Sequence, residues 1–199
     1  MASDPEPRLI YAPDQPPQPW RNGGGQTREL LLWPADSDAW RLRISLARID
    51  RNGPFSAFPG VERWFSVLEG AGVILSIDSR VLKLDAQSAP FCFDGSNPPD
   101  CSLVDGPTND LNLMCRGGRG TLLATISGLA WHAVAAQRGL FTRVAGICRL
   151  GSGRPIELEA ETLLWSGSGA GPMIFEARSS AKAPVGYWLA YQPEHSLMP

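Results

Sequence analysis

Apolar and polar side chains alternate along residues 40–49, which is the clearest structural pattern in the sequence. One parity holds Trp40, Leu42, Ile44 and Leu46, and the other holds Arg41, Arg43 and Ser45. A period of two places successive side chains on opposite faces of a strand. We therefore predict a half-buried β-strand here, whose polar face points either into the lumen of a barrel or out to water.

Shorter runs of this kind recur, separated by turn residues. In the first half we predict strands over residues 9–11, the run after Gly25, 64–68, 73–77, 81–84, 91–93 and 111–115. In the second half we predict strands over 121–126, 141–150, 155–158, 161–165, 173–177 and 185–191. Residues 94–110 are predicted to be loop, and residues 129–138 are ambiguous and compatible with a short helix.

The fold class follows from how the turn residues are spread. The 199 residues include 21 glycines and 18 prolines, which interrupt the apolar runs throughout and leave no room for long helices. Many short strands at such spacing are typical of sandwiches and barrels. We expect an all-β chain with an internal duplication, consisting of a proline-rich segment 1–19 and two similar halves, 20–118 and 119–199.

Charge and composition exclude several classes of function. The formal net charge is −2 and no basic run stands out, so we expect no direct nucleic-acid binding. The sequence has no leader pattern and no run of about 18 apolar residues, so we expect a cytoplasmic protein with no membrane contact. The four cysteines form no C-x-x-C pair, and a Cys92–Cys101 disulfide stays open.

Residues 53–70 carry the motif with the most chemical content. They read Gly-Pro-Phe-Ser-Ala-Phe-Pro-Gly-Val-Glu-Arg-Trp-Phe-Ser-Val-Leu-Glu-Gly and resemble the first cupin motif, which ends in the same Leu-Glu-Gly hairpin. The metal-binding histidines of that motif are missing, and the chain has only His132 and His195. Since a cupin metal site needs two or more imidazoles and a carboxylate, we expect no metal and no cofactor.

Polar residues in apolar strand contexts are the remaining candidates for a site, since no G-x-S-x-G elbow or Walker lysine occurs. Arg63 stands at the start of a predicted strand, where its planar fork suits a bidentate carboxylate. A salt bridge to Glu62, Glu69 or Asp110 is the equally weighted alternative. The other candidates are Asn112 with Arg116, Thr27 with Glu29, Arg41 with Arg43, and the aromatic pair Phe55 and Phe58. Each of these has a structural alternative, such as a solvated strand face or the closed end of a barrel.

Several of these stretches together resemble the HutD (Ves-like) family of the cupin superfamily. The matching residues are Trp20-Arg21-Asn22-Gly23-Gly24-Gly25, Thr27 and Glu29, then Trp40-Arg41-Leu42, Ile44-Ser45, Gly53-Pro54-Phe55-Ser56, Phe58-Pro59-Gly60, Arg63, Leu68-Glu69-Gly70, Asp110-Leu111-Asn112-Leu113-Met114 and Arg116. The resemblance covers residues 20–116 by motif, and only by architecture beyond.

The resemblance implies a bicupin, with two β-barrel or jelly-roll halves packed in one chain. It also implies a link to bacterial histidine utilisation, where such proteins are thought to restrain pathway expression. A small carboxylate such as formylglutamate or urocanate is the implied ligand. The implied ligand-binding residues are Arg63 as the anion clamp, with Phe55, Asn112, Thr27, Glu29, Phe58, Arg43 and Arg116. The oligomeric state stays open, and a homodimer is one option.

A metal-independent enzyme is the alternative function. An isomerase or hydrolase acting on a small acidic metabolite would use Glu29, Glu62 or Asp110 as its acid or base. A third interpretation, an interaction module for a regulator, requires a partner surface that the sequence does not mark.

Overall fold

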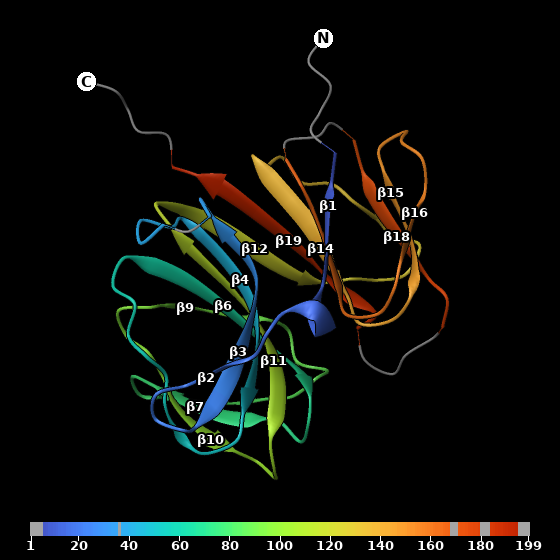
Figure 1. Cartoon of the computed structure of the whole chain (residues 1–199). Helices are drawn as coiled ribbons and strands as arrows, with labels where there is room; N and C mark the ends of the chain where they lie inside the picture. Colours follow the sequence, from blue (N-terminus) through green and yellow to red (C-terminus); the bar gives the residue numbers. More distant parts are fainter. Residues whose placement is uncertain (1–5, 36, 168–170, 180–183, 195–199) are drawn as a thin grey trace, which may run out of the picture. The chain divides into compact units, whose positions relative to one another are not determined.

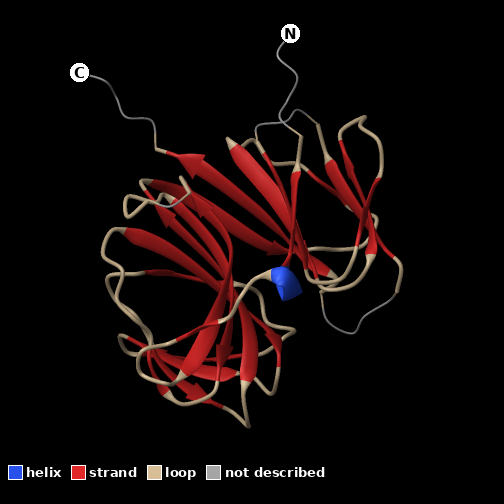
Figure 2. Cartoon of the chain, in the orientation of Figure 1, coloured by secondary structure: helices blue, strands red, loops and turns tan. Residues whose placement is uncertain are grey.

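The structure, a computed structural model, describes residues 6–35, 37–167, 171–179 and 184–194. Its regular structure is almost entirely antiparallel strand, and the described residues include one short 3-10 helix, η1 (Ala12–Asp14) (Figure 2). The chain divides into two compact units. We call the described residues of 15–120 with Glu194 the first unit, and the described residues of 121–193 with 6–14 the second unit.

The first unit consists of two sheets that enclose one apolar core (Figure 1). The larger sheet has the order β2 (Gln18–Pro19), β3 (Gly25–Trp33), β4 (Leu42–Ile49), β11 (Thr108–Arg116), β6 (Val61–Glu69) and β9 (Phe91–Asp94). The smaller sheet has the order β5 (Gly53–Pro54), β10 (Asp100–Leu103), β7 (Val73–Ile77) and β8 (Arg80–Leu84). The core includes Phe65 and Val67 from the larger sheet and Val73, Leu75 and Cys101 from the smaller one.

The second unit is also built from two sheets around a core. The larger sheet has the order β1 (Arg8–Tyr11), β17 (Thr162–Ser166), β14 (Gln137–Thr142), β19 (Gly186–Pro193) and β12 (Gly118–Ala124). The smaller sheet has the order β13 (Ala130–Trp131), β18 (Met173–Ala177), β15 (Gly146–Leu150) and β16 (Ile156–Leu158). Its core includes Leu140, Leu164 and Trp188 from one sheet and Cys148 and Phe175 from the other.

The two units repeat one strand order. The run β4-β11-β6-β9 of the first unit corresponds to β12-β19-β14-β17 of the second, with each strand number raised by eight. In the same way β5-β10-β7-β8 corresponds to β13-β18-β15-β16. The strands shared by the two units number eight in each unit, four in each sheet. This matches the strand count of a jelly roll. The sheets end in edge strands, so each unit is a sandwich of two open sheets. The units are not the closed barrels that the family resemblance implied as one option.

The alternation along residues 40–49 corresponds to β4, but the strand is buried more evenly than predicted. Leu42 and Ile44 are fully buried on one face, and Ser45, Ala47 and Ile49 are buried on the other. The polar parity, which begins at Arg43, lies on the inner face of the sheet, because Ile49 belongs to the core between the sheets. Of the two predicted alternatives for this polar face, the interior of the unit and not the surrounding water is therefore correct.

Two predictions about local structure were wrong, and one segment left ambiguous is now assigned. Residues 129–138 form no helix but the short strand β13, an irregular stretch and the start of β14. The expected loop 94–110 contains β10, whose polar and cysteine-containing sequence gives no strand pattern. The single strand expected over 141–150 is two strands, because the chain turns at residues 143–145. In each case pairing with neighbouring strands overrides a weak local preference.

Candidate functional site

A cavity of about 420 Å³ lies on the inner face of the larger sheet of the first unit. Its floor is formed by alternate residues of three adjacent strands: Arg43, Ser45, Ala47 and Ile49 of β4, Asn112 and Met114 of β11, and Arg63 and Phe65 of β6. Its walls are Gln18, Pro19, Trp20, Arg21, Asn22 and Thr27 on one side and Pro54, Phe55, Ser56 and Phe58 on the other. This lining holds three arginines and, within the described part of the chain, no aspartate or glutamate.

Arg63 is the most deeply buried of the three arginines in this lining. It is only 7% exposed, and its guanidinium carbon lies 5.3, 5.4 and 4.9 Å from the ring centroids of Phe55, Phe58 and Phe93. One Nη1–H donates to the carbonyl oxygen of Ser56 at 3.0 Å. Nε is buried with no hydrogen-bond partner among the described residues, and no described carboxylate forms a salt bridge with this arginine. The salt bridges considered as alternatives are therefore not present.

The loop that carries Phe55 and Phe58 is held in place by main-chain hydrogen bonds. The amide of Phe58 donates to the carbonyl of Gly95 at 2.7 Å, and the amide of Gly95 donates to the carbonyl of Val61 at 2.8 Å. A Cβ at Gly95 would approach the Phe58 carbonyl oxygen to 2.6 Å and Arg63 Cδ to 3.3 Å. Only glycine fits this close approach, so Gly95 allows the loop with Phe58 to pack against Arg63.

Arg43 and Arg63 lie in one row across the sheet. Met114 is the register partner of Arg43 on β4 and of Arg63 on β6, so one strand separates the two arginines. Adjacent strands are about 4.8 Å apart, which places the two Cα atoms roughly 10 Å from each other. Burial, and to a lesser extent the charge of Arg43, lowers the pKa of Arg63 to about 10. Arg63 therefore remains cationic at neutral pH.

Polar groups surround this row. Ser45 and Asn112, register partners and both nearly buried, lie one step further along β4 and β11. Thr27 accepts a hydrogen bond at its Oγ1 from Trp20 Nε1 at 2.8 Å, which ties the wall of β3 to the segment after β2. A guanidinium, an amide and a hydroxyl that converge on one cavity are the donors that a carboxylate requires.

Glu29 and Arg116, two of the predicted ligand-binding residues, lie outside the cavity lining. Glu29 Oε2 accepts a hydrogen bond from Arg43 Nε at 2.9 Å. Arg116 stacks over the ring of Trp40, with its guanidinium carbon 4.5 Å from the ring centroid. The alternation rule placed Arg116 on the face of Asn112, but the strand end carries it beyond the cavity.

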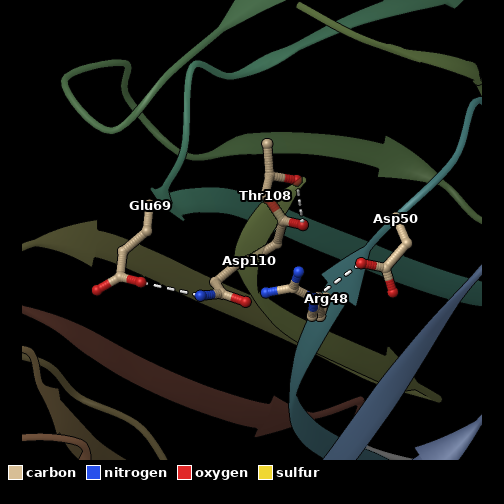
Figure 3. A network of polar contacts seen from close by, with 6 residues as sticks. Arg48, Asp50, Glu69, Thr108 and Asp110 are labelled. Carbon is tan, nitrogen blue, oxygen red and sulfur yellow. Dashed lines mark hydrogen bonds and ion pairs between the residues drawn. The ribbon is translucent and has the colours of Figure 1, made fainter. Parts of the chain in front are cut away.

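The carboxyls proposed as catalytic also lie off the lining. Glu62 Oε1 accepts from the amide of Gly120 at 2.7 Å, and Glu62 alternates with Arg63 and so faces the opposite side of β6. Asp110 is fully buried and accepts at Oδ2 from the hydroxyl of Thr108 at 3.0 Å (Figure 3). Burial raises the pKa of Asp110 to about 8.

No histidine of the described residues lines this cavity. His132 is exposed in the second unit, and His195 lies outside the described residues. Over the described ranges, no three histidine, cysteine, aspartate or glutamate side chains gather in a way that would hold a metal ion. All four cysteines are free, so Cys92 and Cys101 form no disulfide.

About two thirds of the lining residues were not predicted from the sequence. Trp20, Arg21 and Asn22 belonged to the motif that carried the resemblance, which was a usable signal for them. Ser45 shares the parity of Arg43, and this also marked it. Met114 also belonged to the stretches that carried the resemblance, whereas Phe65 has no local signal that separates a cavity floor from an ordinary core.

Solved structures with little sequence similarity share this fold. The chain superposes on oxalate decarboxylase of Bacillus subtilis with a TM-score of 0.64 at 10% identity, covering 96% of this chain and 78% of that one. Together with the strand content, this likeness defines an all-β protein with a cupin-like fold. Among the helices that the structure describes, none is long and apolar enough to cross a membrane.

The family model described as HutD matches residues 12–182, and the chain belongs to this family. It is similar to protein Ves of Citrobacter koseri, with 33% identity over 66% of this chain and 70% of that protein. An uncharacterized protein from the region 3' of hutC in Pseudomonas putida is 37% identical over 54% of this chain and 57% of its own length. HutD from Pseudomonas fluorescens SBW25, solved in a formate condition, superposes with a TM-score of 0.78 at 25% identity, covering 94% and 98%.

Proposed function

We propose that the cavity of the first unit binds a small carboxylate metabolite, and that formylglutamate and urocanate, two intermediates of histidine degradation, are the first candidates. Arg63 is the observation that carries this proposal. A cation that is 7% exposed, without a carboxylate partner among the described residues, is costly unless an anion joins it. A carboxylate in the cavity would accept hydrogen bonds from the guanidinium and neutralise its charge.

The rest of the lining supports a small organic anion. Phe55, Phe58 and Phe65 offer apolar surface to a carbon skeleton, while Asn112 and Ser45 offer polar atoms beside the arginines. Largely apolar pockets with a few convergent polar groups are typical of small-molecule sites. The cavity of about 420 Å³ lies within the usual range for such ligands.

We also propose that the chain is a bicupin in which each unit is one cupin half, with a boundary near residues 119–120. The repeated strand order of the two units supports a duplication. We propose further that ligand binding restrains the expression of histidine-utilisation genes. The support is the family, and the position of the Pseudomonas putida relative beside hutC.

Thermal unfolding with a ligand panel tests the binding proposal. The panel contains formylglutamate, urocanate, glutamate, histidine and formate. A ligand at about 100 times its dissociation constant adds about 2.7 kcal/mol of stability. For a chain of this size we expect a rise in Tm of roughly 5–10 °C with at least one acidic member. Arg63→Met should lose that rise.

Arg119→Met is the matched control, because Arg119 is an exposed arginine that bonds to Glu62 on the other face of the sheet. This variant should keep the ligand response of the parent protein. A panel without any response in the parent protein would refute the proposal. A response that Arg63→Met retains in full would place the ligand elsewhere.

A further inference from the structure

Two arginines face the cavity from the same row of the sheet, and their surroundings differ. Arg63 has aromatic rings and a main-chain carbonyl around it. Arg43 has Glu29, whose Oε2 accepts from Arg43 Nε at 2.9 Å. The side chains of Arg43 and Glu29 are 23% and 31% exposed, so this ion pair is partly shielded from water.

The strand β3 has an irregularity directly after Glu29. Glu29 is opposite Ser45 on β4, whereas Leu31 is opposite Ile44, so one extra residue is inserted between Glu29 and Leu31. A bulge of this kind re-aims the side chains beside it. Glu29 Oε2 accepts from Nε of Arg43, and Arg43 itself lines the cavity.

Glu29 therefore contacts the cavity only through Arg43. The negative charge of Glu29 nevertheless lies close to the cavity. The floor of the cavity carries two buried or half-buried positive charges, and Glu29 offsets one of them. At the short distances and reduced dielectric of such a site, one unit charge changes ligand affinity measurably. The effect grows with the number of charges on the ligand.

We propose that Glu29 is a positioning and specificity residue that limits the preference of the cavity for dianions over monoanions. The inference rests on the proposed function, since it assumes that carboxylates bind beside Arg43 and Arg63. It makes the charge of the ligand, and not only its shape, a property that this chain selects. Glu29 thereby belongs to the site although it does not line the cavity.

The experiment compares glutarate, a dianion, with its monoamide, which has nearly the same shape and one charge fewer. Dissociation constants are measured by calorimetry near neutral pH and at low ionic strength for the parent protein and for Glu29→Gln. Glutamine keeps an oxygen that accepts from Arg43 Nε, so the variant removes the charge and retains the contact. We expect the ratio of glutarate affinity to monoamide affinity to rise roughly three- to tenfold.

Asp50→Asn is the control, because Asp50 Oδ1 accepts from Arg48 Nε at 2.8 Å in an ion pair that does not line the cavity (Figure 3). Its ratio should stay within twofold of the parent. If Glu29→Gln weakens both ligands by one factor, Glu29 only supports Arg43 and the selectivity proposal is wrong. If the parent binds neither these ligands nor any member of the earlier panel, the proposed function itself fails, and this inference with it.

Discussion

The two units share a strand order but differ in what covers their inner faces. In the first unit β11 presents Asn112 and Met114 to the interior, and a cavity remains. In the second unit the corresponding strand β19 presents Trp188, which stacks on Trp131 of β13 at a centroid distance of 5.2 Å and an interplanar angle of 7°. The same position of the shared strand order thus lines a cavity in the first unit and carries a stacked tryptophan pair in the second.

A buried arginine occurs in the corresponding strands β6 and β14. Arg63 is 7% exposed and Arg138 is 3% exposed. Arg138 Nη1 donates to the carbonyl of Gly171 at 2.7 Å, whereas Arg63 lies among three phenylalanine rings beside the cavity. The residue type is common to both units, so the surroundings and not the arginine itself distinguish the candidate site.

The largest effect is expected from opening the packed unit. Trp188→Ala removes a side chain that is 3% exposed, together with its stack on Trp131. Deletions of buried tryptophan typically cost about 3–5 kcal/mol of unfolding free energy. Urea unfolding measures this loss, with Trp40→Ala as the half-exposed control that should cost less than about 2 kcal/mol. A loss for Trp188→Ala no greater than that of the control would contradict the idea that this stack fills the second unit.

A pH effect is expected from Asp110 in the first unit. Because burial raises its pKa to about 8, the folded protein retains a proton that the unfolded chain releases above about pH 4. The contribution of Asp110 to unfolding free energy therefore falls as pH rises from about 4 to about 8 and then levels off.

Asp110→Asn should remove this dependence and stabilise the protein at neutral pH, by an amount on the order of a few kcal/mol. Chemical denaturation of both proteins across this pH range measures the difference. Asp105→Asn, at an exposed turn, is the control. Parallel curves for the parent and Asp110→Asn would show that the buried carboxyl is not protonated.

The smallest change in stability, with a clear functional result, is expected from filling the cavity of the first unit with a larger side chain. Asn112→Trp places on β11 the kind of side chain that β19 carries, and the cavity of about 420 Å³ offers it room. We expect unfolding free energy to change by less than about 2 kcal/mol, while the Tm response to the ligand panel disappears. A preserved response would show that the ligand does not occupy the floor of this cavity.

The sequence predicted most strands and part of the candidate site, and the reason differs between them. Strands such as β4 and β7 have apolar runs bounded by turn residues, so local pattern identifies them. Phe55, Phe58 and Arg63 lie in one motif, and the structure gathers all three around the cavity. Glu29, predicted as a ligand-binding residue, contacts Arg43 and lies outside the cavity lining, a placement that the local pattern does not indicate.

The sequence by itself determined the all-β class, the HutD resemblance and the scarcity of histidine, because these depend on residue types and their spacing. Only the tertiary structure decided that the polar face of β4 lies inside, that Arg43 and Arg63 share a row, and that Arg116 lies beyond the cavity. Those facts depend on strand register and on neighbours far away in the chain. Pairing such as Met114 with both arginines has no trace in the local pattern.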